Sequence, residues 1–94
     1  MLFALTGIFK PDIEAEWERV HERFSEHLAQ PFLTVTLGGS LRDKDGRRRG
    51  VLLFLEAKDF ETATAFAQSS PYVLEGLYQS VEVNELRLEV GRVE

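Results

Sequence analysis

Residues 51–55 read Val-Leu-Leu-Phe-Leu, a run of five apolar side chains that is typical of a β-strand. Because side chains alternate between the two faces of a strand, apolar residues at both parities mean that both faces of this strand need cover. Residues 32–37 read Phe-Leu-Thr-Val-Thr-Leu and predict a second strand that ends at Gly38-Gly39. The polar stretch 42–50 between the two strands holds an Asp-Gly turn signal, so we expect a hairpin.

Further strands and helices are expected on both sides of this hairpin. The first helix has apolar residues at the spacing of one helical face: Ile13, Trp17, Val20, Phe24 and Leu28. The other expected elements are a strand over residues 1–9, an Asp12 cap and an end near residues 30–31 for the first helix, a helix from Asp59 to about residue 69, a short helix over residues 71–76 and a final strand over residues 81–90. The order βαββαβ predicts an α+β, ferredoxin-like fold, with an antiparallel sheet covered by two helices on one face.

The uncovered face of this sheet indicates a second copy of the chain. A two-layer domain leaves one sheet face exposed to solvent, although residues 51–55 present apolar side chains to both faces. In the final strand the apolar parity changes near Asn84-Glu85, which suggests a bulge or a strand that passes to a partner's sheet. With 94 residues the chain buries a modest fraction of its surface alone. The sequence therefore predicts a face-to-face homodimer with a barrel-like core.

Composition excludes several classes of protein. The chain has no cysteine, so the sequence predicts no disulfide framework, thiolate nucleophile or iron–sulfur centre, and a cytoplasmic location is expected. The net charge of −5 argues against nucleic acid as a partner. The apolar runs are too short for a membrane span, and no signal peptide is expected. We expect a single domain over residues 1–94.

The two histidines, His21 and His27, are the side chains suited to proton transfer near neutral pH. They border opposite edges of the apolar stripe of the first helix and lie six residues apart, so they cannot bind one metal ion together. We predict neither a metal nor a cofactor. Glu14 lies on the same flank of the helix as His21, and a half-buried His beside a carboxylate can act as a general base. The alternative is a helix-edge His that packs its ring and meets water.

Two charged segments have simpler explanations than a binding site. Residues 42–49 hold five basic residues and two Asp, and such a short segment is expected to be a solvated hairpin tip, with an anionic ligand as the alternative. On the first helix, carboxylates recur every four residues from Glu14 to Glu26, with Arg19 and Arg23 beside Glu22 and Glu26. This column is expected to be a solvated outer face.

The segment from Ser70 to Tyr78 (SPYVLEGLY) resembles the DP[YF]VxxG[VL]Y signature of YCII-related domains. His21 also fits the family, because it precedes Gly38 by seventeen residues, and Gly38-Gly39 stands where the family has a Gly-Pro pair. The resemblance implies a dimeric α+β barrel and a candidate active site at a cleft that contains His21. It also implies isomerase-like or lyase-like chemistry on small ring compounds such as lactones and hydroxyquinones.

Two departures from the family bear on function. Ser70 replaces the usual acidic residue, a candidate partner for the His, and Gly39 replaces the Pro. A Ser hydroxyl can cap a helix or bond an imidazole but cannot stabilise an imidazolium as a carboxylate would. Tyr72 and Tyr78 can donate to an anionic intermediate or simply fill the core.

The sequence thus predicts a cofactor-free enzyme that uses His21 as general base or acid, with Ser70 and Tyr72 nearby. The predicted reaction is isomerisation or elimination on a small ring or carbonyl compound. The competing hypothesis is a non-catalytic dimeric domain that binds a small ligand or a protein.

Overall fold

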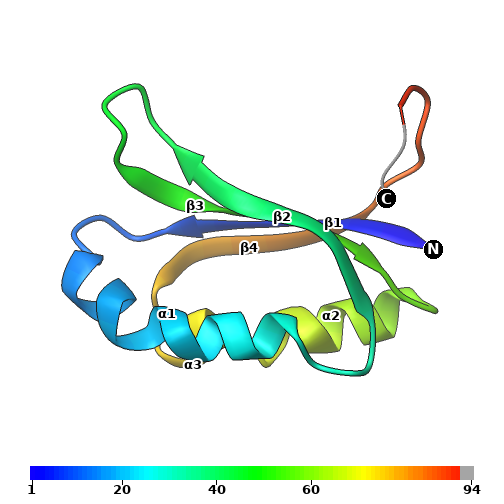
Figure 1. Cartoon of the computed structure of the whole chain (residues 1–94), viewed down its shortest axis with the longest axis horizontal. Coiled ribbons are helices and arrows are strands. Elements are labelled where there is room, and N and C mark those ends of the chain that lie inside the picture. The colour runs from blue at the N-terminus through cyan, green and yellow to red at the C-terminus, as the bar shows by residue number, and fades with distance from the viewer. Residues whose placement is uncertain (92–94) are drawn as a thin grey trace.

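The computed structural model describes residues 1–91, and its elements follow the predicted order (Figure 1). They are β1 (Leu2–Phe9), α1 (Glu14–Leu28), β2 (Thr34–Arg42), β3 (Arg48–Glu56), α2 (Phe60–Gln68), α3 (Pro71–Leu74) and β4 (Tyr78–Glu85). The strands form one antiparallel sheet in the order β2-β3-β1-β4, with β2 and β4 at its edges. The helices lie on one face, and the tip of the β2–β3 hairpin curls away from them (Figure 1). The ferredoxin-like α+β prediction is confirmed.

The core lies between the sheet and the helices and follows from the alternation of side chains along the strands. Burial in β1 alternates residue by residue, and β3 behaves in the same way from residue 51 onward. Buried side chains come from β1 and β3 (Phe3, Leu5, Phe9, Val51, Leu53, Leu55) and from the helices (Val20, Phe24, Ala63, Phe66, Tyr72). Leu52 and Phe54, at the other parity of β3, stay half-buried on the face without helices. Residues 51–55 therefore present apolar side chains to both faces.

The two long helices begin in different ways. Asp59 caps α2 as predicted, because its carboxylate accepts a hydrogen bond from the Thr62 N–H at 2.8 Å. The prediction that Asp12 caps α1 is wrong: the N-cap is Ile13, which provides no side-chain hydrogen bond. Asp12 instead has a φ of 61°, so the chain turns there through a left-handed conformation before the helix starts. A residue with that φ lies outside the extended geometry that a capping side chain requires.

An ion-pair cluster ties α1 to the end of α3. Arg19 and Arg23 both donate to Glu75, at 3.3 and 3.0 Å, and not to Glu22 and Glu26 on their own helix as expected. The hydrogen bonds from the two guanidinium groups hold the pKa of Glu75 below its usual value. Because the groups are exposed, the cluster orients the helices more than it stabilises the fold.

The hairpin is longer than predicted. β2 was expected to end at Gly38-Gly39, yet both glycines keep their ladder pairing with β3 and the strand continues to Arg42. On the other side β3 begins at Arg48, so the turn is confined to residues 43–47. Glycine weakens a strand, but the apolar partner strand holds both residues in the sheet.

The last strand is shorter at its carboxyl end than the predicted range of residues 81–90. β4 ends at Glu85, and residues 86–90 lie outside the sheet. The parity change near Asn84 coincides with the end of the strand. The bulge expected there is wrong, because the register shift between β1 and β4 lies at Ile8/Phe9, whereas the alternative, a strand that passes to a partner's sheet, stays a prediction.

Tyr78 provides a test of the packing at the start of β4. Its ring lies where a Cβ on Gly7 would collide with it, and its buried hydroxyl has no hydrogen-bond partner within residues 1–91. A buried polar group without a partner destabilises a fold by about 1–3 kcal/mol. We therefore expect Tyr78→Phe to leave the free energy of unfolding in urea unchanged or to raise it by about 1 kcal/mol. Gly7→Ala, which forces the ring aside, should lower it; a clear loss of stability in Tyr78→Phe would contradict the assignment.

Candidate active site

A cleft of about 410 Å³ lies between α1 and the β2–β3 hairpin. Its lining includes Trp17, His21 and Ser25 from α1, Ser40 and Arg42 from β2, Arg48 from β3, and Tyr72 from α3. Phe24, Leu28 and Leu53 supply apolar surface. Gly38 lines the cleft and packs closely on Leu53, because a Cβ at that position would lie 2.7 Å from Leu53 Cδ2.

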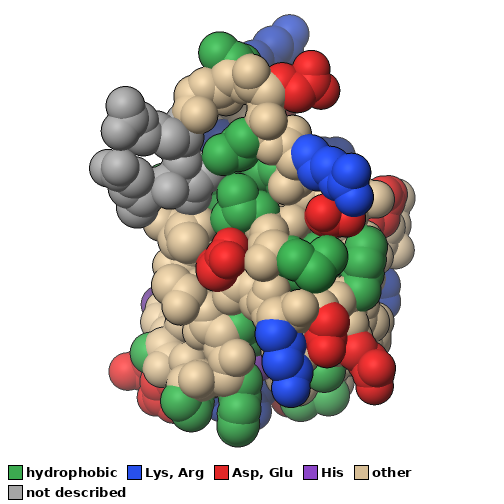
Figure 2. Space-filling model, turned by 90° about the vertical axis from the view of Figure 1, so that its right-hand side faces the viewer, with side chains coloured by type: hydrophobic (Ala, Val, Ile, Leu, Met, Phe, Trp, Pro, Cys, Tyr) green, Lys and Arg blue, Asp and Glu red, His purple; other side chains and the backbone are tan. Residues whose placement is uncertain are grey.

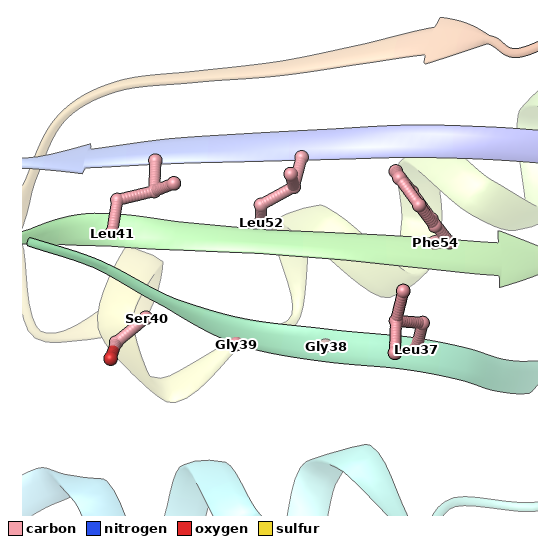
Figure 3. A pocket seen from close by; sticks show the side chains of 7 residues that line it. All are labelled: Leu37, Gly38, Gly39, Ser40, Leu41, Leu52 and Phe54. Atoms are coloured by element: carbon pink, nitrogen blue, oxygen red, sulfur yellow. The ribbon is translucent and has the colours of Figure 1, made fainter.

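One β-bulge in β2 determines which of its side chains face the cleft. β2 pairs Val35 with Leu55 and then Leu37 with Phe54, so Thr36 is an extra residue. An extra residue reverses the alternation of side chains beyond it. Val35 therefore lines the cleft, whereas Leu37 points to the sheet face without helices (Figure 3).

A second bulge turns an arginine toward the helix. The pairing passes from Leu41–Gly50 directly to Arg42–Arg48, so Arg49 is the extra residue on β3. Without this bulge, the alternation of side chains over residues 51–55 would continue toward the turn and would place Arg49 on the helix side of the sheet. With it, Arg48 faces α1.

Trp17 is held between two flat polar groups. The Arg48 guanidinium carbon lies 3.5 Å from the centroid of the indole, and the His21 imidazole stacks on the indole at 4.2 Å with an interplanar angle of 5°. Two groups at these distances cannot occupy one face of the ring, so the indole lies between them. A guanidinium over an indole face is attracted by the negative π-surface of the ring.

A backbone hydrogen bond sets the tautomer of His21. Its Nδ1 lies 3.0 Å from the carbonyl oxygen of Glu18, one turn earlier in α1. Because a carbonyl oxygen only accepts, Nδ1 carries the hydrogen in the neutral ring and Nε2 carries the free lone pair. The ring is half-buried and lines the cleft. The arrangement leaves Nε2 as the nitrogen able to accept a proton.

Glu14 does not partner His21. Its Oε2 accepts a hydrogen bond of 2.8 Å from Arg48 Nη1, so the carboxylate expected beside the imidazole forms an ion pair with the guanidinium. The bulge at Arg49 explains why, since it places a cation where the sequence pattern shows only a helix flank.

Ser70 and Tyr72 lie together at the start of α3, but only one of them lines the cleft. The Ser70 hydroxyl is buried and accepts a hydrogen bond from the Tyr72 N–H at 3.2 Å, so Ser70 caps the short helix. Tyr72 is among the cleft residues, and its ring stacks on Phe24 with centroids 4.2 Å apart. Burial raises the pKa of Tyr72 to about 12, an effect that Trp17 and Arg48 partly offset, so its hydroxyl stays protonated at neutral pH.

His27 lies outside the cleft. Its Nε2 is 2.9 Å from the carbonyl oxygen of Phe66, and the two rings stack at 4.3 Å. It therefore joins α1 to α2 as a packed, hydrogen-bonded side chain.

Trp17 and Arg48, which stack on each other in the cleft, are not assigned to a site by the sequence analysis. Trp17 precedes His21 by one helical turn, and that spacing was a usable signal for a stacked pair. Arg48 lies in the basic stretch, and nothing in a single sequence distinguishes it from Arg47 or Arg49 before the bulge is known.

A second hollow lies on the opposite face of the sheet. This groove of about 300 Å³ is lined by Leu37, Leu41, Leu52 and Phe54, whose side chains point away from α1 (Figure 3). The backbone of Gly38 and Gly39 borders both the groove and the cleft. Only the thickness of β2 separates the two hollows there.

Two further observations concern membrane-spanning helices and metal-binding side chains. Within residues 1–91, no helix has the length and apolar character needed to cross a membrane. In the same part of the chain, no three His, Asp or Glu side chains gather closely enough to hold a metal ion.

Comparisons with known proteins agree on the architecture. A family model described as YCII-related domain matches residues 1–87. A 5-chloro-2-hydroxyhydroquinone dehydrochlorinase from Burkholderia phenoliruptrix, solved with 2,5-dihydroxybenzoquinone, is 19% identical, with a TM-score of 0.78 over 93% of this chain and 94% of that one. A protein from Bacteroides thetaiotaomicron described as a putative antibiotic biosynthesis monooxygenase is 16% identical, with a TM-score of 0.57 over 96% and 90% of the two chains. At such identities the likeness shows the fold alone. No curated protein matches the chain.

The buried tyrosines predict a fall in stability at alkaline pH. Burial raises the pKa of Tyr72 to about 12 and also raises the pKa of Tyr78, whereas an unfolded tyrosine ionises near pH 10. Above about pH 10 the unfolded chain therefore binds fewer protons than the folded one, and the free energy of unfolding decreases as pH rises. Urea unfolding between about pH 8 and about pH 11 should show this decrease, with a shallower slope in Tyr72→Phe. Phenolate absorbance that appears at the same pH in folded and urea-unfolded protein would contradict it.

Proposed function

The chain belongs to the YCII-related domain family, and from that premise we propose that it is a cofactor-free enzyme in which His21 transfers a proton on a small ring or carbonyl compound. The reaction class is isomerisation or elimination. One observation carries the proposal: the hydrogen bond from Nδ1 to the Glu18 carbonyl leaves Nε2 of a cleft histidine free to accept a proton.

The proposed chemistry needs only side chains of this cleft. Nε2 of His21 takes a proton from a substrate carbon beside a carbonyl group, and the electron pair of the broken C–H bond moves onto the carbonyl oxygen as an enolate. In an isomerisation the imidazolium returns the proton to a different carbon. In an elimination the enolate expels a leaving group from the neighbouring carbon, and the imidazolium later releases its proton to water.

Tyr72 and Ser70 have distinct proposed roles. The Tyr72 hydroxyl is protonated at neutral pH, as for any tyrosine whose pKa is not strongly lowered, so it can donate a hydrogen bond to the enolate oxygen. Ser70 caps the helix that carries Tyr72 and does not line the cleft, so we assign it as a positioning residue that acts through Tyr72.

The choice of substrates to test first follows from the dehydrochlorinase that shares the fold. The name of that protein describes an elimination on a hydroxylated ring, and its structure holds 2,5-dihydroxybenzoquinone. Hydroxyquinones and chlorinated hydroquinones are therefore the first compounds for a turnover screen of this chain, and lactones are added because the resemblance to the family implies them.

A second candidate function has its own support. Within the described residues the Glu14 carboxylate pairs with Arg48, and Ser70 stands where the family has an acid, so no carboxylate is hydrogen-bonded to His21. A domain that binds a small ligand in the cleft without converting it agrees with this arrangement. Turnover by the wild-type chain separates the two functions.

We also propose that two copies pair through their open sheet faces, in the cytoplasm. The support is the groove of Leu37, Leu41, Leu52 and Phe54 on the face that no helix covers. A second copy would bury this apolar surface, and the hydrophobic effect would make that burial favourable for a chain of this size.

The end of the molecule where the chain termini lie has a different surface. Seen from that end, hydrophobic side chains are interspersed with acidic and basic ones (Figure 2).

Replacement of His21 tests the catalytic proposal. His21→Ala should abolish turnover of any substrate found in the screen, because it removes the only proton acceptor proposed in the cleft. The matched control is His27→Ala, which removes a histidine from the same helix outside the cleft and should keep most of the activity if the variant folds. Circular dichroism and light scattering should show that His21→Ala keeps its fold and assembly. Full turnover by His21→Ala would overturn the proposal.

Light scattering tests the dimer. Leu37 and Leu74 are both exposed leucines, at 58% and 72%, but Leu37 lies on the open sheet face and Leu74 on α3. We expect a dimer for the wild type and for Leu74→Asp, and a monomer for Leu37→Asp, because a buried carboxylate at the interface would be desolvated without a partner. A wild-type monomer at micromolar concentration, or a Leu37→Asp dimer of unchanged affinity, would refute this mode of pairing.

A further inference from the structure

The charge of the cleft is opposite to the charge of the chain. The chain has a net charge of −5, yet the cleft is lined by Arg42 and Arg48 and, within residues 1–91, by no Asp or Glu. Cationic side chains in a hollow with apolar walls attract anions more strongly than the same groups do on an open surface. The lining therefore favours a negatively charged ligand.

The geometry points to Arg48 as the group that binds this charge, and we propose that the cleft takes a planar, single-ring anion whose oxygens replace Glu14 as the partner of Arg48. This inference rests on the proposed function, because it names the substrate class of the same cleft. Arg42 is less suited to the role, since its guanidinium donates to the Gly46 carbonyl in the hairpin turn at 3.0 Å.

Arg48 is already held in the conformation that such a contact needs. Stacking on Trp17 fixes the plane of the guanidinium, and the bulge at Arg49 directs the side chain toward α1. A planar guanidinium donates two parallel hydrogen bonds to a pair of oxygens on one ligand. Because the Arg48 side chain has little conformational freedom left to lose on binding, most of the free energy of these hydrogen bonds would contribute to the affinity.

The ion pair with Glu14 is of a kind that a ligand can displace. Glu14 is 59% exposed, whereas Arg48 is 23% exposed, so the carboxylate can turn into water while the guanidinium stays in place. Exposed ion pairs contribute little to stability. A ligand oxygen that approaches from the less exposed cleft side would make the stronger bond.

The size and walls of the cleft indicate the shape of the ligand. A volume of about 410 Å³ is at the small end of the range for ligand pockets. Phe24, Leu28 and Leu53 provide apolar contact for a ring. An acidic hydroxyquinone or an aromatic carboxylate satisfies both requirements.

Calorimetry with two matched quinones tests the inference. 2,5-Dihydroxybenzoquinone is anionic at neutral pH, and 2,5-dimethoxybenzoquinone has the same ring but cannot ionise. Wild-type protein should bind the anion at least about tenfold more tightly, as expected for a hydrogen-bonded charge pair. Equal affinities, or no binding of either quinone at millimolar concentration, would overturn the proposal.

Variants assign the preference to Arg48. Arg48→Gln should abolish it, whereas Arg49→Gln makes the same change of net charge on the adjacent residue and should alter the affinity by less than about twofold. If Arg48→Gln does not fold, Arg48→Lys and Glu14→Gln carry the test. Arg48→Lys should keep a reduced preference, and Glu14→Gln should raise the affinity for the anion because it removes the competing carboxylate. A merely structural ion pair would instead give Glu14→Gln unchanged or weaker binding, and that result would refute the inference.

The test separates this inference from the proposed function. If the anion preference depends on Arg48 while no substrate is converted, the catalytic proposal fails and the ligand class stands. If His21→Ala abolishes turnover while Arg48→Gln keeps the wild-type preference, the catalytic proposal stands and the ligand class is wrong.

Discussion

The stacking of the Trp17 indole between Arg48 and His21 connects the helix layer to the sheet at the position of the cleft. It orients three side chains at once, because each flat group limits the rotation of its neighbour. The carbonyl of Glu18 then sets the imidazole tautomer, and Glu14 neutralises the guanidinium on its outer side. The stack therefore determines how the guanidinium and the imidazole are placed at the cleft.

Much of the fold could be predicted from local pattern. The helical spacing in α1, the apolar run 51–55 and the Asp59 cap are signals that lie within one element, and the structure bears them out. The errors occur at the ends of elements, where the local signal is overridden by a left-handed turn, as at Asp12, or by pairing with a neighbouring strand. Gly38-Gly39 predicts the end of a strand, but pairing with β3 extends β2 beyond it. Of the two interpretations of the parity change near Asn84, the bulge is wrong, because β4 ends at Glu85.

The candidate site shows the same contrast between residues that local pattern predicts and residues whose placement depends on strand pairing. His21 and Tyr72 could be found because their residue types and the resemblance to the family point to them, and the structure brings both to one cleft. Arg48 could not be found, because its orientation depends on one unpaired residue in a ladder of backbone hydrogen bonds. Single-sequence parity arguments assume an uninterrupted strand, so they fail where a bulge exchanges the two faces. Glu14 was misassigned for the same reason, since its true partner is the arginine that the bulge delivers.

Trp17 is the only tryptophan of the chain. Its indole forms a wall of the cleft and touches both the imidazole and the guanidinium. The tryptophan fluorescence of the protein therefore arises from one residue, and that residue lines the candidate cleft. Protonation of the stacked imidazole, displacement of the guanidinium or arrival of an aromatic ring would each change the emission of this residue. The natural sequence thus contains an optical probe of the cleft that needs no label and no added chromophore.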